Sequence, residues 1–111
     1  MYEYRAIVKK VYDGDTITVD IDLGFDIWMK NKSIRLAGID TPEIRGEERP
    51  EGLVVKDIVL KMIPVGSEVI LKTEKDATGK YGRYLAEVWK VGDFNSLNEW
   101  LLDNGYAEPY L

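Results

Sequence analysis

Residues 11–22 read Val-Tyr-Asp-Gly-Asp-Thr-Ile-Thr-Val-Asp-Ile-Asp, a turn that leads directly into an alternating segment. The Asp-Gly pair favours a tight turn, because both residues tolerate turn backbone conformations. After it, Ile17, Val19 and Ile21 alternate with polar residues. This period of two predicts a strand over residues 16–22, with one face in a hydrophobic core and the other half exposed.

The remaining segments predict four more strands and two helices. β-Branched and aromatic residues indicate the strands. Apolar residues at helical spacing over residues 55–63 indicate the first helix, which Pro64 and Gly66 end. A Ser-x-x-Glu pattern that begins at Ser96 is typical of the start of the second helix. The polar run over residues 45–52 is expected to be a loop. The expected strands are residues 4–11, 27–39 (bent near Asn31), 68–74 and 84–90.

The order of these elements predicts a mainly β fold with helices, of the α+β class. It matches a five-stranded Greek-key barrel of the OB type, with a helix between strands three and four and a short C-terminal helix. Such a closed barrel leaves no exposed strand edge. A chain of 111 residues with 45% apolar residues is expected to form one domain over residues 1–111.

The residue types that are absent narrow the possible chemistry. The chain has no cysteine and no histidine, which excludes disulfides, zinc–thiolate sites and Ser-His-Asp catalysis. Acid–base chemistry therefore depends on carboxylates, and any metal should prefer oxygen ligands. The formal net charge of −5 predicts weak non-specific binding to nucleic acid.

No apolar run approaches the roughly 18 residues of a membrane span, and the N-terminus lacks the features of a signal peptide. The chain as given is therefore expected to act in the cytoplasm, without a membrane. Trimming from a longer precursor would leave secretion open. The three tryptophans are expected to pack in the core or at its rim rather than to form a platform for nucleobases. They are Trp28, Trp89 and Trp100.

Charged side chains suited to phosphodiester chemistry occur in three motifs. Two acids can hold a hard cation, a third can act as a base, and two arginines can bind a phosphate as its charge grows. Each motif alone is more typical of an ordinary turn or loop. Three unrelated turns would have no reason to supply this complementary set in this order. The residues are Asp15, then Arg35, Asp40 and Glu43, and finally Arg83.

The three motifs resemble those of the staphylococcal nuclease-like (thermonuclease) family. The matching text is Val-Tyr-Asp-Gly-Asp-Thr at 11–16, Arg-Leu-Ala-Gly-Ile-Asp-Thr-Pro-Glu at 35–43 and Gly-Lys-Tyr-Gly-Arg at 79–83. The resemblance covers nearly the whole chain. It implies a calcium-dependent hydrolase that cleaves the phosphodiester bonds of DNA and RNA and leaves 3′-phosphate ends.

The resemblance also implies a metal site and a catalytic base. Asp15 and Asp40 are expected to bind Ca²⁺ through their carboxylates, and Thr41 through its backbone carbonyl. Two carboxylates and a carbonyl leave room for water and a phosphate oxygen, since calcium accepts six to eight oxygens. Glu43 is expected to align or deprotonate the attacking water.

The resemblance assigns the basic residues to the substrate. Arg35 and Arg83 are expected to contact the scissile phosphate, with Arg83 also placed to help the leaving oxygen. Lys80 and Tyr81 are expected to lie against a neighbouring phosphate. The expected substrate is nucleic acid, with single-stranded DNA or RNA favoured, and the protein is expected to be a monomer.

An alternative from another class is a non-catalytic OB-type module that binds nucleic acid or protein. Binding relatives of this fold have usually lost some of the acids or arginines. Here the acids and arginines of the three motifs are all present, which favours the enzyme. They are Asp15, Arg35, Asp40, Glu43 and Arg83. The acidic composition indicates weaker or more selective activity, on short or single-stranded substrates.

Overall fold

The computed structural model describes residues 2–78 and 83–110, with the side chains of all of these except 74–78. The elements in chain order are β1 (Tyr2–Asp13), β2 (Thr16–Asp22), β3 (Trp28–Leu36), β4 (Ile39–Asp40), the 3₁₀ helix η1 (Gly46–Glu48), α1 (Arg49–Met62), β5 (Glu68–Thr78), β6 (Tyr84–Lys90), α2 (Leu97–Asp103) and β7 (Glu108–Pro109).

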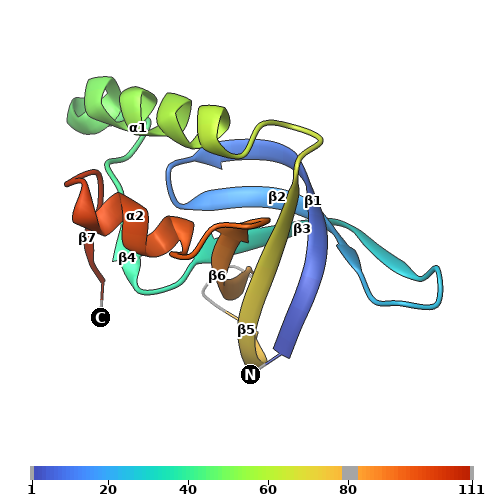
Figure 1. Cartoon of the computed structure of the whole chain (residues 1–111). Helices are drawn as coiled ribbons and strands as arrows, with labels where there is room; N and C mark the ends of the chain where they lie inside the picture. The colour runs from blue at the N-terminus through green and yellow to red at the C-terminus, as the bar shows by residue number, and fades with distance from the viewer. Residues whose placement is uncertain (1, 79–82, 111) are drawn as a thin grey trace.

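Five strands close into a barrel in the order β1-β2-β3-β6-β5 (Figure 1). Neighbouring strands are antiparallel, apart from β3 and β6, which run parallel. Helix α1 follows β4 and η1 in the chain and precedes β5. It lies above β1 and β2, and α2 packs beside β6 (Figure 1). The predicted α+β barrel of the OB type, with its two helices, is confirmed.

The barrel core is formed by the residues that alternate along the strands. Ile17, Val19 and Ile21 point into it and are buried, as the period of two predicts. From α1, Val55 and Val59 are buried against the barrel. The apolar face of the helix therefore covers the barrel beside the β1–β2 turn, where the acidic residues of the first motif lie. Neither helix in the described part of the chain is long and apolar enough to cross a membrane.

The expectation of a loop over residues 45–52 was wrong in its second half. Helix α1 begins at Arg49, and Gly46–Glu48 already form a 3₁₀ turn. Pro50 occupies the first turn of α1, where a missing backbone N–H costs nothing. The run is polar because most of its residues face solvent rather than because it lacks structure, and only Gly52 in it is buried.

The third strand also ends earlier than expected, at Leu36 rather than Ile39. Gly38 adopts a φ of +76° and turns the chain. Ile39 and Asp40 then form β4, which pairs with β7 in a separate two-stranded sheet. The expected bend is present at Asn31, which has a φ of +53°. Strand β5 reaches Thr78, four residues beyond the expected end.

Helix α2 holds the C-terminal segment against the barrel. Ser96 caps it by accepting a hydrogen bond from the Glu99 N–H at 3.0 Å, as the sequence pattern predicts. Asn98 is buried, accepts from the Val88 N–H at 3.0 Å and donates to the Ala37 carbonyl at 2.8 Å. These bonds join α2 to β6 and to the turn before β4, and so bring β7 alongside β4.

Candidate active site

The β1–β2 turn lies beneath α1 (Figure 1), and Gly14 allows this close approach. A Cβ at Gly14 would lie 2.6 Å from the Val55 side chain and 2.8 Å from the Thr41 hydroxyl oxygen. No side chain fits in that space. Gly14 therefore lets the turn, the segment after β4 and the helix converge on Asp15.

Asp15 is buried and held by donors from three segments. Its Oδ2 accepts a hydrogen bond from the Thr41 N–H at 3.0 Å, and its Oδ1 accepts one from the Thr16 hydroxyl at 3.2 Å. The Nη2 of Arg35 lies 3.5 Å from Oδ2. The Asp15 carbonyl also accepts from the Leu36 N–H at 2.8 Å. This carboxylate is thus fixed between β2, β3 and the segment after β4.

Arg35 is fixed by carbonyl groups around the β3–β4 turn. Its Nη1 donates to the carbonyls of Leu36 and Ile39, both at 2.8 Å. Its Nη2 lies 3.5 Å from Asp40 Oδ1, and the guanidinium stacks 5.4 Å from the ring centre of Tyr110. Because two carbonyls accept hydrogen bonds from one of its nitrogens, the planar guanidinium group has a fixed orientation.

Glu43 is exposed at the rim of the site. Its backbone N–H donates to Glu48 Oε1 at 3.4 Å. Gly52 of α1 supports this segment from below, because a Cβ there would lie only 2.0 Å from the Glu43 carbonyl oxygen. The conformation of the Glu43 segment therefore depends on a helical residue without a side chain.

Arg83 enters the site from the residue before β6. Its Nη1 donates to the Thr16 hydroxyl at 3.3 Å, across 67 positions of sequence. The parallel pairing that sets Tyr84 opposite Ile34 brings it there. Lys80 and Tyr81, the other two expected substrate contacts, lie outside the described residues.

The side chains surround one cavity of about 650 Å³, and the expected residues Asp15, Arg35, Asp40, Glu43 and Arg83 all line it. Sequence reasoning missed three other lining residues, Tyr12, Asp13 and Arg45. Tyr12 and Asp13 stand within the first motif, whereas Arg45 reaches the cavity only through the fold. Tyr110 lines the cavity as well.

Burial and neighbouring carboxylates raise the pKa of two acids in the site. Burial, and next the Asp15 carboxylate, raise the pKa of Asp40, although Arg35 opposes the shift. Burial, and next a hydrogen bond and repulsion from Asp15, raise the pKa of Asp13 to about 7. Such a set of acids favours a bound cation, because a positive charge relieves both the repulsion and the cost of burial.

The donor set suits a hard divalent cation. Among the described residues, no group of three or more metal-ligating side chains is gathered around one point. Two carboxylates, from Asp15 and Asp40, and the Thr41 carbonyl are oxygen donors of the kind that calcium takes, and water would complete its shell. The Thr41 hydroxyl is buried without a hydrogen-bond partner in the described part of the chain. The Thr41 residue as a whole is only 5% exposed.

A family model described as Staphylococcal nuclease homologue matches residues 33–111, well over half of the chain. The matched segment contains Arg35, Asp40, Glu43 and Arg83, and the first motif precedes it. The chain belongs to the staphylococcal nuclease family.

Individual relatives agree with this membership. Thermonucleases from Staphylococcus intermedius and Staphylococcus hyicus are 36% and 34% identical over 78% and 94% of this chain. The uncharacterized protein MJ1439 of Methanocaldococcus jannaschii is 32% identical over 97% of it. The chain spans only 49%, 57% and 60% of these three proteins, respectively.

A substitution at Gly52 tests whether the position of Glu43 depends on helix α1. We expect Gly52→Ala to displace the Glu43 segment, since the added Cβ meets a backbone carbonyl that cannot rotate away. Overpacking of this kind costs about 1–3 kcal/mol of stability. If Glu43 acts in cleavage as the family resemblance implies, its displacement should also lower the rate by about 10²-fold. Thermal unfolding and cleavage assays measure the two effects.

Val54→Ala is the matched control for Gly52→Ala, because Val54 lies on the same helix and is 56% exposed. Alanine favours a helix by up to about 1 kcal/mol over glycine. If Gly52→Ala were more stable than the parent protein and equally active, the Glu43 segment would not depend on this contact.

The pKa of Asp13 predicts how the free energy of unfolding depends on pH when no metal is bound. Its pKa is about 7 in the folded protein and 3.8 ordinarily, so folding raises it. The folded state binds the proton more tightly, and stability therefore falls as the pH rises from about 4 to 7. Asp13→Asn keeps the acceptor for the Asp15 N–H and removes the charge.

We expect Asp13→Asn to raise the free energy of unfolding at pH 8 by about 2 kcal/mol, with about 4 kcal/mol as the upper limit that a shift of this size allows. At pH 4 the two proteins should unfold alike. Urea unfolding at both pH values, with a chelator present, measures the difference. The exposed Asp93→Asn is the control, and a gain at pH 4 equal to that at pH 8 would rule out the ionisation of Asp13 as the cause.

Proposed function

We propose that this protein is a calcium-dependent nuclease that hydrolyses phosphodiester bonds of DNA and RNA, with single strands favoured. The observation that carries the proposal is the convergence of Asp15, Arg35, Asp40, Glu43 and Arg83 on one cavity. The membership in the staphylococcal nuclease family and the relatives named thermonuclease support it.

In this proposal the two arginines bind the scissile phosphate. Arg35 is oriented by two backbone carbonyls and Arg83 is anchored on Thr16. Their fixed donors meet the negative charge that grows on the phosphate oxygens in the transition state, without further rearrangement. Lysine would be a poor substitute for either, because a point charge lacks the forked geometry.

Glu43 takes the proton of the attacking water. The water oxygen forms a bond to phosphorus, and the bond from phosphorus to the leaving 5′ oxygen breaks, which leaves a 3′-phosphate and a 5′-hydroxyl. The leaving oxygen takes its proton from solvent while Arg83 stabilises its charge. The exposed position of Glu43 at the rim gives water access to it.

Asp15, Asp40 and the Thr41 carbonyl would hold the calcium ion. When bound, a divalent cation supplies a Lewis acid that neutralises phosphate charge and acidifies water. The Asp15–Thr41 hydrogen bond keeps two of these three groups in register, and Arg35 lies 3.5 Å from both carboxylates.

Cleavage of fluorescently labelled single-stranded DNA with calcium, with magnesium or with a chelator tests the proposal. We expect cutting with calcium that the chelator abolishes. Asp40→Asn should weaken calcium binding, measured as the calcium-dependent rise in melting temperature. Binding of DNA without any cutting would instead support a non-catalytic OB-type module.

A further inference from the structure

The outer surface of the barrel continues from the active site to the opposite end of the molecule. The polar residues of β2 from Thr16 to Asp22 share this face, because side chains two apart in a strand point the same way. Thr16 is opposite Arg35 at one end, and Asp22 is opposite Trp28 at the other. Six residue steps of about 3.3 Å make this outer face roughly 20 Å long.

Lysines line the outer face between its two ends. Lys10 is paired with Thr18 in the neighbouring strand and is exposed, with no ion pair among the described residues. Farther along, Lys9 and Lys30 lie 3.6 and 3.5 Å from the same oxygen of buried Asp20. One carboxylate thus holds two ammonium groups at the surface, which leaves a positive charge in excess.

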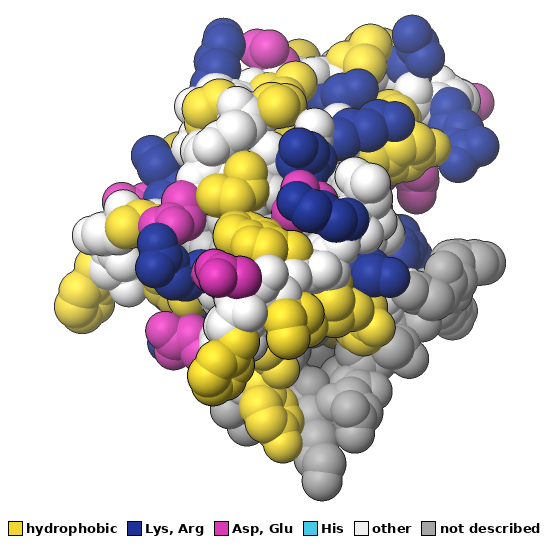
Figure 2. Space-filling view, turned by 90° about the vertical axis from the view of Figure 1, so that its right-hand side faces the viewer, with side chains coloured by type: hydrophobic (Ala, Val, Ile, Leu, Met, Phe, Trp, Pro, Cys, Tyr) yellow, Lys and Arg dark blue, Asp and Glu magenta, His cyan; other side chains and the backbone are white. Residues whose placement is uncertain are grey.

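The outer face is positive on a negative protein. At its active-site end Arg35 is paired with Asp15 and Asp40. Beyond that end the face carries four cations (Arg5, Lys9, Lys10 and Lys30) and three carboxylates (Asp20, Asp22 and Glu68), whereas the chain has a net charge of −5. Seen from the hairpin end, the molecule shows most of its visible Lys and Arg side chains in the upper half of the view, interspersed with hydrophobic ones (Figure 2). This composition suits a polyanion better than the apolar surface of a protein partner.

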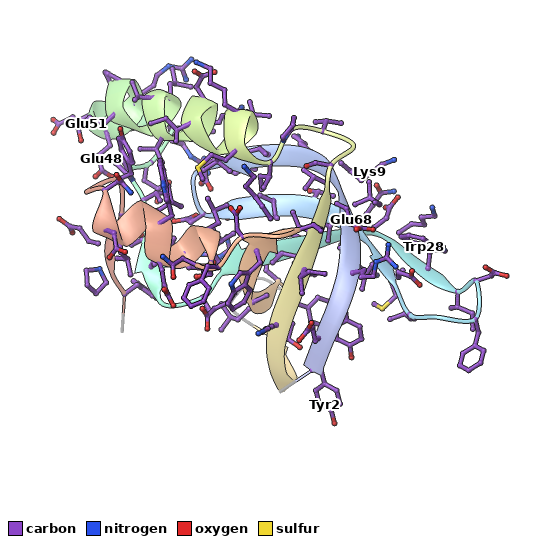
Figure 3. All side chains as sticks on the ribbon, viewed as in Figure 1. Tyr2, Lys9, Trp28, Glu48, Glu51 and Glu68 are labelled. Carbon is purple, nitrogen blue, oxygen red and sulfur yellow. The ribbon has the colours of Figure 1, made fainter. Side chains whose placement is uncertain are left out.

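An exposed tryptophan ends the outer face. Trp28 is 39% exposed, and Lys30 Nζ lies 5.3 Å from its ring centre. The sequence led us to expect a tryptophan in the core or at its rim, but Trp28 lies outside it. Figure 3 places Trp28, Lys9 and Glu68 together where the β2–β3 hairpin leaves the barrel, far from Glu48 and Glu51 at the active-site end.

We propose that a single-stranded nucleic acid bound at the active site continues along this outer face. Lys10 and the pair Lys9 and Lys30 bind its successive phosphates, and Trp28 stacks on an unpaired base. A single strand fits because stacking on an aromatic ring needs a base that is free of its complement. This inference rests on the proposed function, because it extends the same substrate away from the scissile phosphate.

The test is the affinity for a labelled 12-nucleotide single-stranded DNA, measured by fluorescence anisotropy with a chelator present so that nothing is cut. We expect Trp28→Ala to weaken binding at least about fivefold. Lys10→Gln should lower the slope of log affinity against log salt by about 0.7, the value for one phosphate contact on a single strand. Lys61→Gln, on α1 and also beside an aspartate, is the matched control and should change neither quantity.

Two more measurements separate this inference from a loss of folding and from the nuclease proposal. Binding of the 12-mer should quench tryptophan fluorescence in the parent protein and less in Trp28→Phe, whose melting temperature serves as the folding check. If both face variants bind like Lys61→Gln, or if the 12-mer does not bind, the inference fails. If the outer-face inference fails in this way but the protein still cuts DNA, the nuclease proposal stands. If the variants bind more weakly but the parent protein does not cut, binding along the outer face stands and the nuclease proposal fails.

Discussion

Glu43→Gln should lower turnover on single-stranded DNA by about 10²–10⁴-fold, the usual contribution of a positioned general base. The amide keeps the size of the side chain but cannot accept the proton of the attacking water. Because Glu43 is exposed at the rim of the site, its replacement should not change the melting temperature. Single-turnover cleavage with saturating calcium isolates the chemical step from substrate binding.

Glu47→Gln is the matched control for this base. Glu47 is exposed in η1, four residues along the chain, and is not among the residues that line the cavity. We expect it to cut at the parental rate. Equal rates for the parent protein and Glu43→Gln would remove Glu43 from the mechanism, whereas equal losses in both variants would indicate a general effect of negative charge near the site.

Arg83→Ala should lower the rate of the chemical step by about 10²–10³-fold, the cost of losing one preorganised donor to the transition state. Arg83 donates to the Thr16 hydroxyl, and in the proposed mechanism it stabilises the leaving oxygen while Glu43 acts on the attacking water. Arg83→Lys should recover little of the rate, since lysine cannot form two parallel hydrogen bonds. The informative measurement is the ratio of the single-turnover rates of Arg83→Lys and Arg83→Ala.

Lys61→Ala removes the same charge from an exposed pair on α1 and is the control for Arg83→Ala. It should cut like the parent protein. If Arg83→Lys were as active as the parent, Arg83 would supply only a charge. If Arg83→Ala raised only the KM, the residue would bind substrate and transition state equally.

The sequence predicted the barrel because its signals are local. The alternation over residues 16–22, the turn before it and the cap at Ser96 all depend on residues within a few positions of one another. The prediction of a loop over 45–52 was wrong in its second half because the polar residues there face solvent from a helix, and Gly52 is buried against the Glu43 carbonyl. A buried glycine in a polar run has no local signature that separates it from a loop glycine.

The candidate site shows the same division. Asp15, Arg35, Asp40, Glu43 and Arg83 were predicted from three motifs, whereas Tyr12, Asp13 and Arg45 were not. Tyr110 reaches Arg35 only because β7 pairs with β4. That pairing in turn follows the anchoring of α2 by Asn98, a polar residue whose burial could not be foreseen from its neighbours.

By itself, the sequence determined the order of the strands and helices, the types of side chain present and the absence of histidine and cysteine. These depend on residue identity and short-range backbone preferences. Tertiary structure alone decided which of those side chains share a cavity. The parallel contact of β3 with β6 brings Arg83 to Thr16, and the packing of α1 sets Gly52 beneath Glu43. Such contacts between different elements form only when the core closes, because no local preference encodes them.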